Sequence, residues 1–341
     1  MHLLRGVIQH YDWGTTSFIP ELIGDTPTTK PCAELWFGTH PLAPSEVFIA
    51  QTWSPLADLT GELDVLVKVL SAQTPLSLQV HPSAEQARAG FLRETESHTD
   101  PLQRCYQDQN EKSELLIALT RFEALCGFAP VKDSVALLRS LGCDVEADVL
   151  QNDGIASYLS WAYSCTQPVV MTNAPLWLNN LAQMYPNDPS LRVAPLLNYV
   201  VLEVGEAIAL GAGNLHAYLG GSGIEVMTSS DNVVRAGFTR KHIAVQELLS
   251  IVDTRVLAQP VQTPQRVGTA LQYQSPNGSF GVQVLEIDGT VTINPEPVHR
   301  ILVCVDGSTD ELTRGSAGVI LPHESLKLHG NARIFVCAGS R

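Results

Sequence analysis

The sequence predicts a mainly β protein with an α-helical insertion, and three observations support this fold class. Short apolar runs typical of strands, such as 65–70 and 332–337, lie towards both ends of the chain. Between 132 and about 195 the pattern changes to longer segments that carry helix start and stop signals. From about 259 onward the chain consists of short β runs separated by turns, which is typical of a small β-sandwich or jelly roll.

The helices are expected from local signals. Ser83 and Gln86 form a capping box that opens a helix to about Arg93. Asp133 is expected to cap a helix that ends near Gly142, and Pro175 precedes a helix that Pro186 stops. Further helices are predicted over 144–165 and 245–252, and the C-terminal strands over 281–287, 300–305, 318–321 and 332–337.

Composition sets limits on function. The 341 residues allow two or three domains with a sizeable core. No apolar run reaches the roughly 18 residues that span a bilayer, and the first residues soon turn polar, so we expect a cytoplasmic protein without a membrane partner. The formal net charge of −14 argues against nucleic acid as a partner. An anionic substrate would therefore need a local cluster of Lys and Arg.

The seven cysteines are scattered and contain no C-x-x-C pair. This pattern predicts reduced, mostly buried thiols and neither a disulfide framework nor a zinc ribbon. The sequence also contains no Walker A loop and no G-x-G-x-x-G, so a nucleotide is not expected.

Two segments carry polar residues where apolar ones are expected. Lys68 is the one charge inside the apolar run 65–70, and a buried charge needs a partner or an anion. In the next strand Ser77, Gln79 and His81 share one face, as in a strand that lines a cavity. On this pattern alone, a metal ligand and a satisfied core histidine are both acceptable interpretations of His81.

The most informative stretch is 216–241, HAYLGGSGIEVMTSSDNVVRAGFTRK. Its short β-like pieces, 224–227 and 233–235, alternate with Gly- and Ser-rich turns. A His, an acid and an Arg on neighbouring strands could hold a metal and an anionic substrate together. A polar barrel rim with ordinary surface charges explains the same residue types, so both interpretations stay open at this point.

The stretch resembles the longer signature of the type I mannose-6-phosphate isomerases (phosphomannose isomerases). It departs from that signature at Thr228, where Ala is usual, and at Arg240, where Pro is usual. The matching positions are His216, Ala217, Tyr218, Glu225, Met227, Ser230, Asp231, Asn232, Arg235, Ala236, Gly237, Thr239 and Lys241.

The family's shorter signature is similar to 106–114. Glu111 stands where the family has His, and Ser113 where it has Pro. In an extended chain Glu111 points away from the face that Lys112 and Glu114 share, so we expect it to tune Lys112 from outside the site. Tyr11-Asp12-Trp13-Gly14 and 33–41, which contains His40, resemble N-terminal landmarks, although His40 by itself indicates only a loop histidine. The residues that match the shorter signature, at 106–114, are Tyr106, Asp108, Asn110, Lys112 and Glu114.

The resemblance implies duplicated cupin (jelly-roll) barrels. We expect a catalytic cupin domain from 1–130 and 196–257, a helical insertion at 131–195 and a C-terminal cupin-like β-sandwich at 258–341. It also implies one Zn²⁺ per chain and interconversion of mannose 6-phosphate and fructose 6-phosphate through an enediol, by a monomer or weak homo-oligomer. The implied zinc ligands are Gln79, His81, Glu114 and His216, two imidazoles and two oxygen donors, a set that suits zinc.

The remaining residues receive candidate roles. Arg235 cannot give up its proton at neutral pH, so we expect it to stabilise the enediolate. Lys112 and Asp231 are candidates for proton handling at O1 and O2. The alternatives are a non-catalytic, zinc-containing sugar-phosphate binding or regulatory paralogue, suggested by Glu111 and Ser113, and, more remotely, an iron-dependent cupin dioxygenase. Ser77, Lys68 and Lys241 are expected at the phosphate, and Tyr218, Glu225 and Trp13 at other parts of the substrate.

Overall fold

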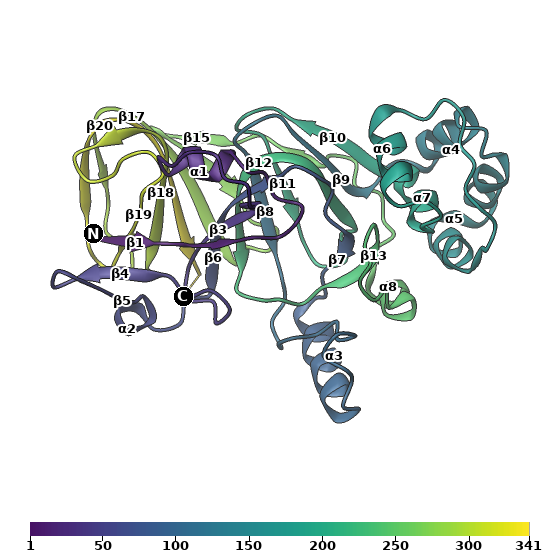
Figure 1. The fold of residues 1–341 in the computed structure, drawn as a ribbon, viewed down its shortest axis with the longest axis horizontal. Coiled ribbons are helices and arrows are strands. Elements are labelled where there is room, and N and C mark those ends of the chain that lie inside the picture. Colours follow the sequence, from purple (N-terminus) through teal and green to yellow (C-terminus); the bar gives the residue numbers. More distant parts are fainter. Residues whose placement is uncertain (341) are drawn as a thin grey trace.

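The computed structural model describes residues 1–340. The molecule is elongated, with three parts side by side (Figure 1). The C-terminal strands form one end, the central strands lie in the middle, and helices α4–α7 form the other end. Helix α3 projects from the central part.

Within residues 1–340, the central strands belong to an eleven-stranded sheet. Its main path runs β14-β11-β8-β12-β6-β3-β2, and β12 also pairs with β7 and β9, to which β13 and β10 are added. Its strands are β2 (Val7–Gln9), β3 (Glu34–Phe37), β6 (Val65–Ala72), β7 (Leu78–Val80), β8 (Glu114–Ala118), β9 (Phe122–Phe128), β10 (Leu197–Leu202), β11 (Ala207–Leu210), β12 (His216–Thr228), β13 (Val234–Gly237) and β14 (Val261–Gln262).

The second sheet, of nine strands in the described chain, has the order β15-β16-β17-β20-β18-β19-β1-β4-β5. Its strands are β1 (His2–Arg5), β4 (Glu46–Ile49), β5 (Thr52–Pro55), β15 (Gln265–Val267), β16 (Ala270–Gln274), β17 (Phe280–Ile293), β18 (Arg300–Thr309), β19 (Ala317–Ile320) and β20 (Leu326–Gly339). The four C-terminal runs expected from the sequence lie on β17, β18, β19 and β20.

The strand pairing corrects the expected domain boundaries at two places. The N-terminal strands β1, β4 and β5 join the C-terminal sheet, because β1 pairs with β19 on one side and with β4 on the other. Leu4 of β1 and Val47 of β4 are both buried. Conversely, β14 pairs with β11 of the central sheet. The chain therefore crosses between the two sheets near Gly6, and the rest of the expected division stays a proposal.

The helices are α1 (Phe18–Leu22), α2 (Ala57–Thr60), α3 (Ala84–Glu96), α4 (Val131–Ser140), α5 (Asp144–Ser164), α6 (Leu176–Met184), α7 (Ser190–Val193), the 3₁₀ turn η1 (Ala194–Leu196) and α8 (Val245–Ile251). The capping box of Ser83 and Gln86 is present at the start of α3. The expected cap at Asp133 is wrong: α4 begins at Val131 behind Pro130, so Asp133 lies in its first turn. Helix α5 is interrupted at Gly154, whose φ is 75°.

Strand β6 is buried along its whole length because both of its faces are covered. Val65, Val67 and Val69 pack into the core shared with strands of the nine-stranded sheet. Alternation directs Lys68 and Leu70 to the opposite face, the interior of the central sheet. The mainly apolar run in the sequence therefore contains one polar residue, Lys68, on the interior face of the central sheet.

Strand β12 corrects the expectation of short β pieces separated by turns. It runs without a break from His216 to Thr228, and its register shifts between Tyr218 and Gly220. At Gly221 φ is 116° and an added Cβ would lie 2.6 Å from the carbonyl oxygen of Arg121. The glycines therefore allow one strand to pair with β7 and β9 at its start and with β6 and β8 at its end.

Candidate active site and metal centre

Three strands, β7, β8 and β12, bring the candidate metal ligands together. Gln79 on β7 lies opposite both His216 on β12 and Arg235 on β13, so the three side chains share one face. Glu114 begins β8, and His81 follows directly after β7. His81, Glu114 and His216 are buried, and their ligand atoms lie within 4.8 Å of one another.

Backbone carbonyls fix the orientation of both histidines. His81 Nδ1 lies 2.8 Å from the carbonyl oxygen of Asn232, and His216 Nδ1 lies 2.9 Å from that of Asn214. Because a carbonyl oxygen can only accept, each Nδ1 must donate, which leaves the Nε2 lone pair of a neutral ring directed at Glu114.

The Nε2 atoms of both rings lie close to the carboxylate of Glu114. His81 Nε2 lies 3.3 Å from Glu114 Oε1, and His216 Nε2 lies 3.5 Å from Glu114 Oε2. His81 Nε2 and Glu114 Oε2 are buried without a hydrogen-bond partner. Burying such acceptors is costly unless a cation binds them, so this donor set fits a divalent metal ion.

The charges nearby favour the metal-binding protonation states. Burial, together with the Lys112 charge, lowers the pKa of His81 to about 4, so the ring is neutral near neutral pH. Burial alone would raise the pKa of Glu114, but Lys112 and His81 outweigh it and hold this pKa well below its usual range. Lys112 Nζ lies 2.8 Å from Glu114 Oε1.

Gln79 lies at the edge of this cluster. Its side-chain nitrogen is 3.5 Å from His216 Nε2, and its oxygen accepts a hydrogen bond of 3.2 Å from Ser77 Oγ. Rotating the amide by 180° would present the oxygen to the cluster without moving the backbone. The role of Gln79 as a fourth ligand, which the family resemblance implies, stays a prediction.

The two signature loops are locked to each other by side-chain amides and carboxylates. The Asp108 carboxylate accepts hydrogen bonds from Ser230 Oγ at 3.0 Å and from the Asp231 backbone N–H at 2.9 Å. The Asn232 side chain bonds the backbone of residues 107, 108 and 110. Since the Asn232 carbonyl also holds His81, this lock connects both loops to the metal cluster.

Lys68, which the sequence assigns to the phosphate, is paired within the protein. Its ammonium lies 3.0 Å from Glu225 Oε2 and 3.7 Å from Glu34 Oε1, and all three side chains are buried. Burial alone would lower the pKa of Lys68, but Glu225 and Glu34 outweigh it and raise it. Two carboxylates therefore compensate this charge within the protein, and contact of Lys68 with the phosphate stays a prediction.

Tyr218, Glu225 and Trp13 border the same interior. The Tyr218 hydroxyl donates to Glu225 Oε1 at 2.9 Å, and both residues are buried. Trp13 is half-buried and stacks on Tyr11, with ring centroids 5.7 Å apart. Their contact with a substrate stays a prediction.

Arg235 and Lys241 form a local positive site. Within residues 1–340, no carboxylate lies within ion-pair distance of either side chain. Burial lowers the pKa of Arg235, and burial followed by the Arg235 charge lowers that of Lys241. Two uncompensated cations near each other can attract an anion despite the negative net charge.

The sequence interpretation of His40 as a plain loop residue missed a contact. His40 is 5% exposed, and its Nε2 lies 3.1 Å from Asp231 Oδ2. Burial would raise the pKa of Asp231, but the His40 contact and the charges of Lys112 and Lys68 outweigh it and lower this pKa. The His40-Pro41 pair in the sequence offered no signal for this contact, because Asp231 is far away along the chain.

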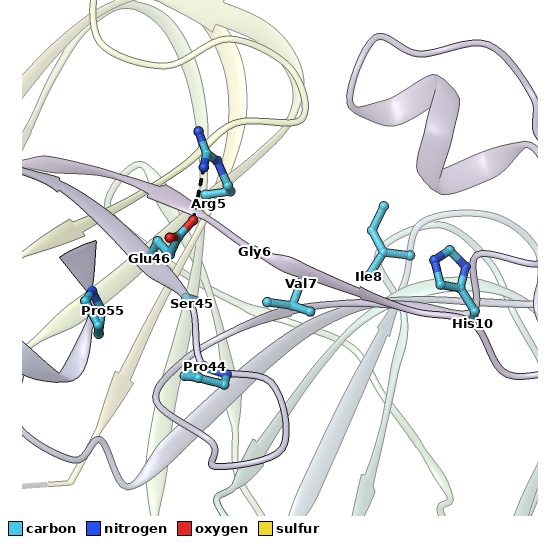
Figure 2. A pocket seen from close by; sticks show the side chains of 9 residues that line it. All are labelled: Arg5, Gly6, Val7, Ile8, His10, Pro44, Ser45, Glu46 and Pro55. Atoms are coloured by element: carbon cyan, nitrogen blue, oxygen red, sulfur yellow. Dashed lines mark hydrogen bonds and ion pairs between the residues drawn. The ribbon is translucent and has the colours of Figure 1, made fainter. Parts of the chain in front are cut away.

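A separate pocket of about 620 Å³ lies over the chain that joins β1 to β2 (Figure 2). Arg5 at one end is paired with Glu46 at 3.0 Å and stacks on Trp53, while His10 lies at the other end. None of the candidate site residues lines this pocket. It is not the site that the signatures build.

The comparisons with known proteins identify the family. Residues 1–131 match the family model described as phosphomannose isomerase type I, catalytic domain. The mannose-6-phosphate isomerase of Escherichia coli strain K12 is 31% identical, over 98% of this chain and 99% of that protein. The chain belongs to this family. The rat mannose-6-phosphate isomerase is 30% identical over 94% of the chain and 88% of its own length.

A solved structure of the family extends the likeness to the whole fold. The crystal structure of a mutant of phosphomannose isomerase from Salmonella typhimurium matches with a TM-score of 0.90 and 29% identity, covering 100% of both chains. The expected fold class, mainly β with a helical insertion and duplicated cupin barrels, is confirmed. Among the described helices, none is long and apolar enough to cross a membrane.

Proposed function

We propose that this chain is a zinc-dependent aldose–ketose isomerase that interconverts mannose 6-phosphate and fructose 6-phosphate. The observation that carries the proposal is the buried His81–Glu114–His216 cluster, whose ligand atoms lie within 4.8 Å of one another and in which His81 Nε2 and Glu114 Oε2 have no hydrogen-bond partner. In a member of this family, that cluster is where a metal-dependent sugar isomerisation would take place.

His81, Glu114 and His216, with the Gln79 oxygen, would hold the ion, and the borderline nitrogen and oxygen donors favour zinc. When bound, zinc acts as a Lewis acid that polarises sugar oxygens and stabilises the charge of the enediolate. The neighbouring Lys112 ammonium adds a second positive charge beside Glu114.

The cations Arg235 and Lys241, with the Ser77 hydroxyl, supply the phosphate and enediolate interactions. Arg235 lies on the face that holds Gln79, so its charge stands next to the ligands, where negative charge would develop during the reaction. Lys241 is exposed and suits the more distant phosphate. The Ser77 hydroxyl donates to Gln79 at 3.2 Å, so it lies beside a candidate ligand.

Lys112 and Asp231 are proposed to move protons at the two reacting oxygens. An aldose–ketose conversion transfers one proton between C1 and C2, and the oxygens must lose and regain protons in step. Lys112 Nζ lies 2.8 Å from Glu114 Oε1, and the charges of Lys112 and Lys68 help to lower the pKa of Asp231. An ionised Asp231 can accept a proton and return it.

The test is a coupled assay of purified protein with mannose 6-phosphate. We expect turnover that a chelator abolishes and that added zinc restores. Absence of turnover with a full complement of zinc would contradict the proposal. We also propose that the protein acts in the cytoplasm as a monomer or weak homo-oligomer, in keeping with its seven free cysteines, and light scattering would measure the mass.

A further inference from the structure

His40 lies in the loop after β3, beneath the signature loop that carries Asp231. Its ring meets the edge of Trp36, with centroids 5.1 Å apart and planes at 89°. The Leu42 backbone N–H donates to His40 Nδ1 at 3.3 Å. An Nδ1 that accepts carries no proton, so the ring proton is on Nε2, which points to Asp231 Oδ2 at 3.1 Å.

Asp231 is held at its backbone as well as at Oδ2. Its N–H donates to Asp108 Oδ2 at 2.9 Å, which fixes the main chain of the signature loop. The Asp231 side chain is 35% exposed, whereas that of His40 is 6% exposed. One carboxylate oxygen is thus held by a buried ring, while part of the Asp231 side chain stays exposed.

The charged and titratable groups that face Asp231 come from several elements. Lys68 on β6 and Lys112 just before β8 favour its ionised form, as does the contact with His40. Burial and the Glu34 charge raise the pKa of Tyr11, on the N-terminal loop, and the Asp231 charge adds to this. Of these groups, His40 is the one for which the structure records a direct contact with Asp231.

We propose that His40 is a positioning residue, which holds the Asp231 carboxylate through Oδ2 so that the opposite oxygen exchanges a proton with the sugar. This inference rests on the proposed isomerase function and assigns it a residue. Asp231 takes the proton from one sugar hydroxyl and returns it to the neighbouring oxygen, so the carboxylate is regenerated in each turnover. The proton of His40 Nε2 stays on the ring throughout.

His40 is not itself the base. Its Nε2 already carries a proton, its Nδ1 lone pair is occupied by the Leu42 N–H, and the ring is buried against Trp36. The ring therefore has no free lone pair with which to accept a substrate proton. Its geometry instead resembles that of a residue that orients a catalytic group, a role in which loss of the contact costs roughly ten- to a hundredfold in activity.

Two substitutions separate positioning from packing. His40→Gln keeps an amide N–H near the position of Nε2 and can still donate to Asp231. His40→Asn is shorter, so it retains a partner for the Leu42 N–H but loses the donor to Asp231. His329→Asn, at an exposed histidine outside the site, is the matched control.

We expect His40→Asn to lower kcat for mannose 6-phosphate roughly ten- to a hundredfold, with KM nearly unchanged. The acid limb of its pH–rate profile should move to higher pH, since the ionised carboxylate loses a donor. His40→Gln should retain most of the activity and the wild-type profile. Zinc content should equal that of wild type in both variants.

The outcomes distinguish this inference from the function on which it rests. If wild type fails to turn over mannose 6-phosphate, the proposed function is overturned. If wild type is active and His40→Asn matches it in kcat and profile, or if both variants lose activity equally, the positioning role is overturned and the function stands. Should His40→Asn not fold, a ¹⁵N spectrum of wild type decides: a ring proton on Nδ1 of His40 would overturn the proposal.

Discussion

The Asn232 carbonyl oxygen accepts the Nδ1 proton of His81 at 2.8 Å, while the Asn232 side chain bonds the backbone of the 106–110 loop. One residue therefore sets the tautomer of a metal ligand and joins the two signature loops. Any change in the loops is transmitted to the ligand through a single carbonyl. The orientation of His81 is therefore fixed by a residue of the signature loop as well as by its position directly after β7.

The first prediction concerns metal content. Purified wild type should contain about one zinc per chain, and His81→Ala or His216→Ala should lose most of it, since each variant removes one of only two imidazole ligands. Elemental analysis after dialysis measures this. His323→Ala, at an exposed histidine, is the control and should keep its zinc. Full occupancy in either ligand variant would remove the site from this cluster.

The second prediction concerns Arg235. If its guanidinium acts mainly on the enediolate, Arg235→Lys should lower kcat about 10²–10³-fold and change KM only a few-fold. Lysine keeps the charge but not the planar fork of donors. Steady-state kinetics on mannose 6-phosphate measure the two effects, with Lys241→Arg as the matched exchange at the proposed phosphate end. A rise in KM alone would place Arg235 at the phosphate.

The third prediction concerns Lys68. Replacing it with Met leaves the buried carboxylates of Glu34 and Glu225 without their cation, and breaking a buried pair in this way costs about 3–5 kcal/mol. Denaturant unfolding should detect this loss. Lys241→Met, at an exposed lysine, should change stability by less than about 0.5 kcal/mol. Unchanged stability with a raised KM would place Lys68 at the phosphate.

The fourth prediction concerns pH. His81 is neutral in the folded protein down to about pH 4, whereas in the unfolded chain it binds a proton below about 6.5. Between these values the unfolded state holds more protons, so stability falls as pH falls. For protein stripped of metal, this difference amounts to at most about 3 kcal/mol.

Chelator-treated wild type and His81→Gln should therefore be compared in urea unfolding at pH values from 7 to 4. The free energy of unfolding should decrease more steeply with acid in wild type than in the variant. The difference in slope therefore reports His81 together with its coupling to Glu114. Parallel slopes would mean that the buried ring does not have its lowered pKa.

Much of the fold and site followed from local sequence, and the failures have physical causes. The alternation of Ser77, Gln79 and His81 shows which face they share, because side chains in a strand repeat every two residues. Glu114 needed the family signature. The positive charge of Lys68 on β6 is compensated by Glu34 on β3 and Glu225 on β12. Residues close to Lys68 in the sequence give no indication of this pairing. The contact between His40 and Asp231 was not predicted for the same reason, because the two residues are far apart along the chain.

Glu111 departs from the family's signature, and its side chain makes a contact with the other sheet that the sequence did not predict. Its side chain accepts a hydrogen bond from Asn277, in the loop between β16 and β17, and its backbone oxygen accepts one from Thr228 Oγ1 at 2.9 Å. The neighbouring Lys112 instead pairs with Glu114 at 2.8 Å. The carboxylate thus faces the second sheet, and the expected tuning of Lys112 should be weak.

The last prediction is that Glu111→Gln keeps activity within about threefold of wild type. A general base would contribute about 10²–10⁴-fold, whereas Glu111 is engaged by Asn277 and Thr228. Gln also retains an oxygen that can accept from Asn277, and Glu111→His should be tolerated. Asn277→Ala is the matched partner variant: if the pair only joins the two sheets, both changes should lower thermal stability slightly and leave the pH–rate profile unmoved. A loss of about 10⁴-fold in kcat for Glu111→Gln, with Asn277→Ala active, would make Glu111 the base.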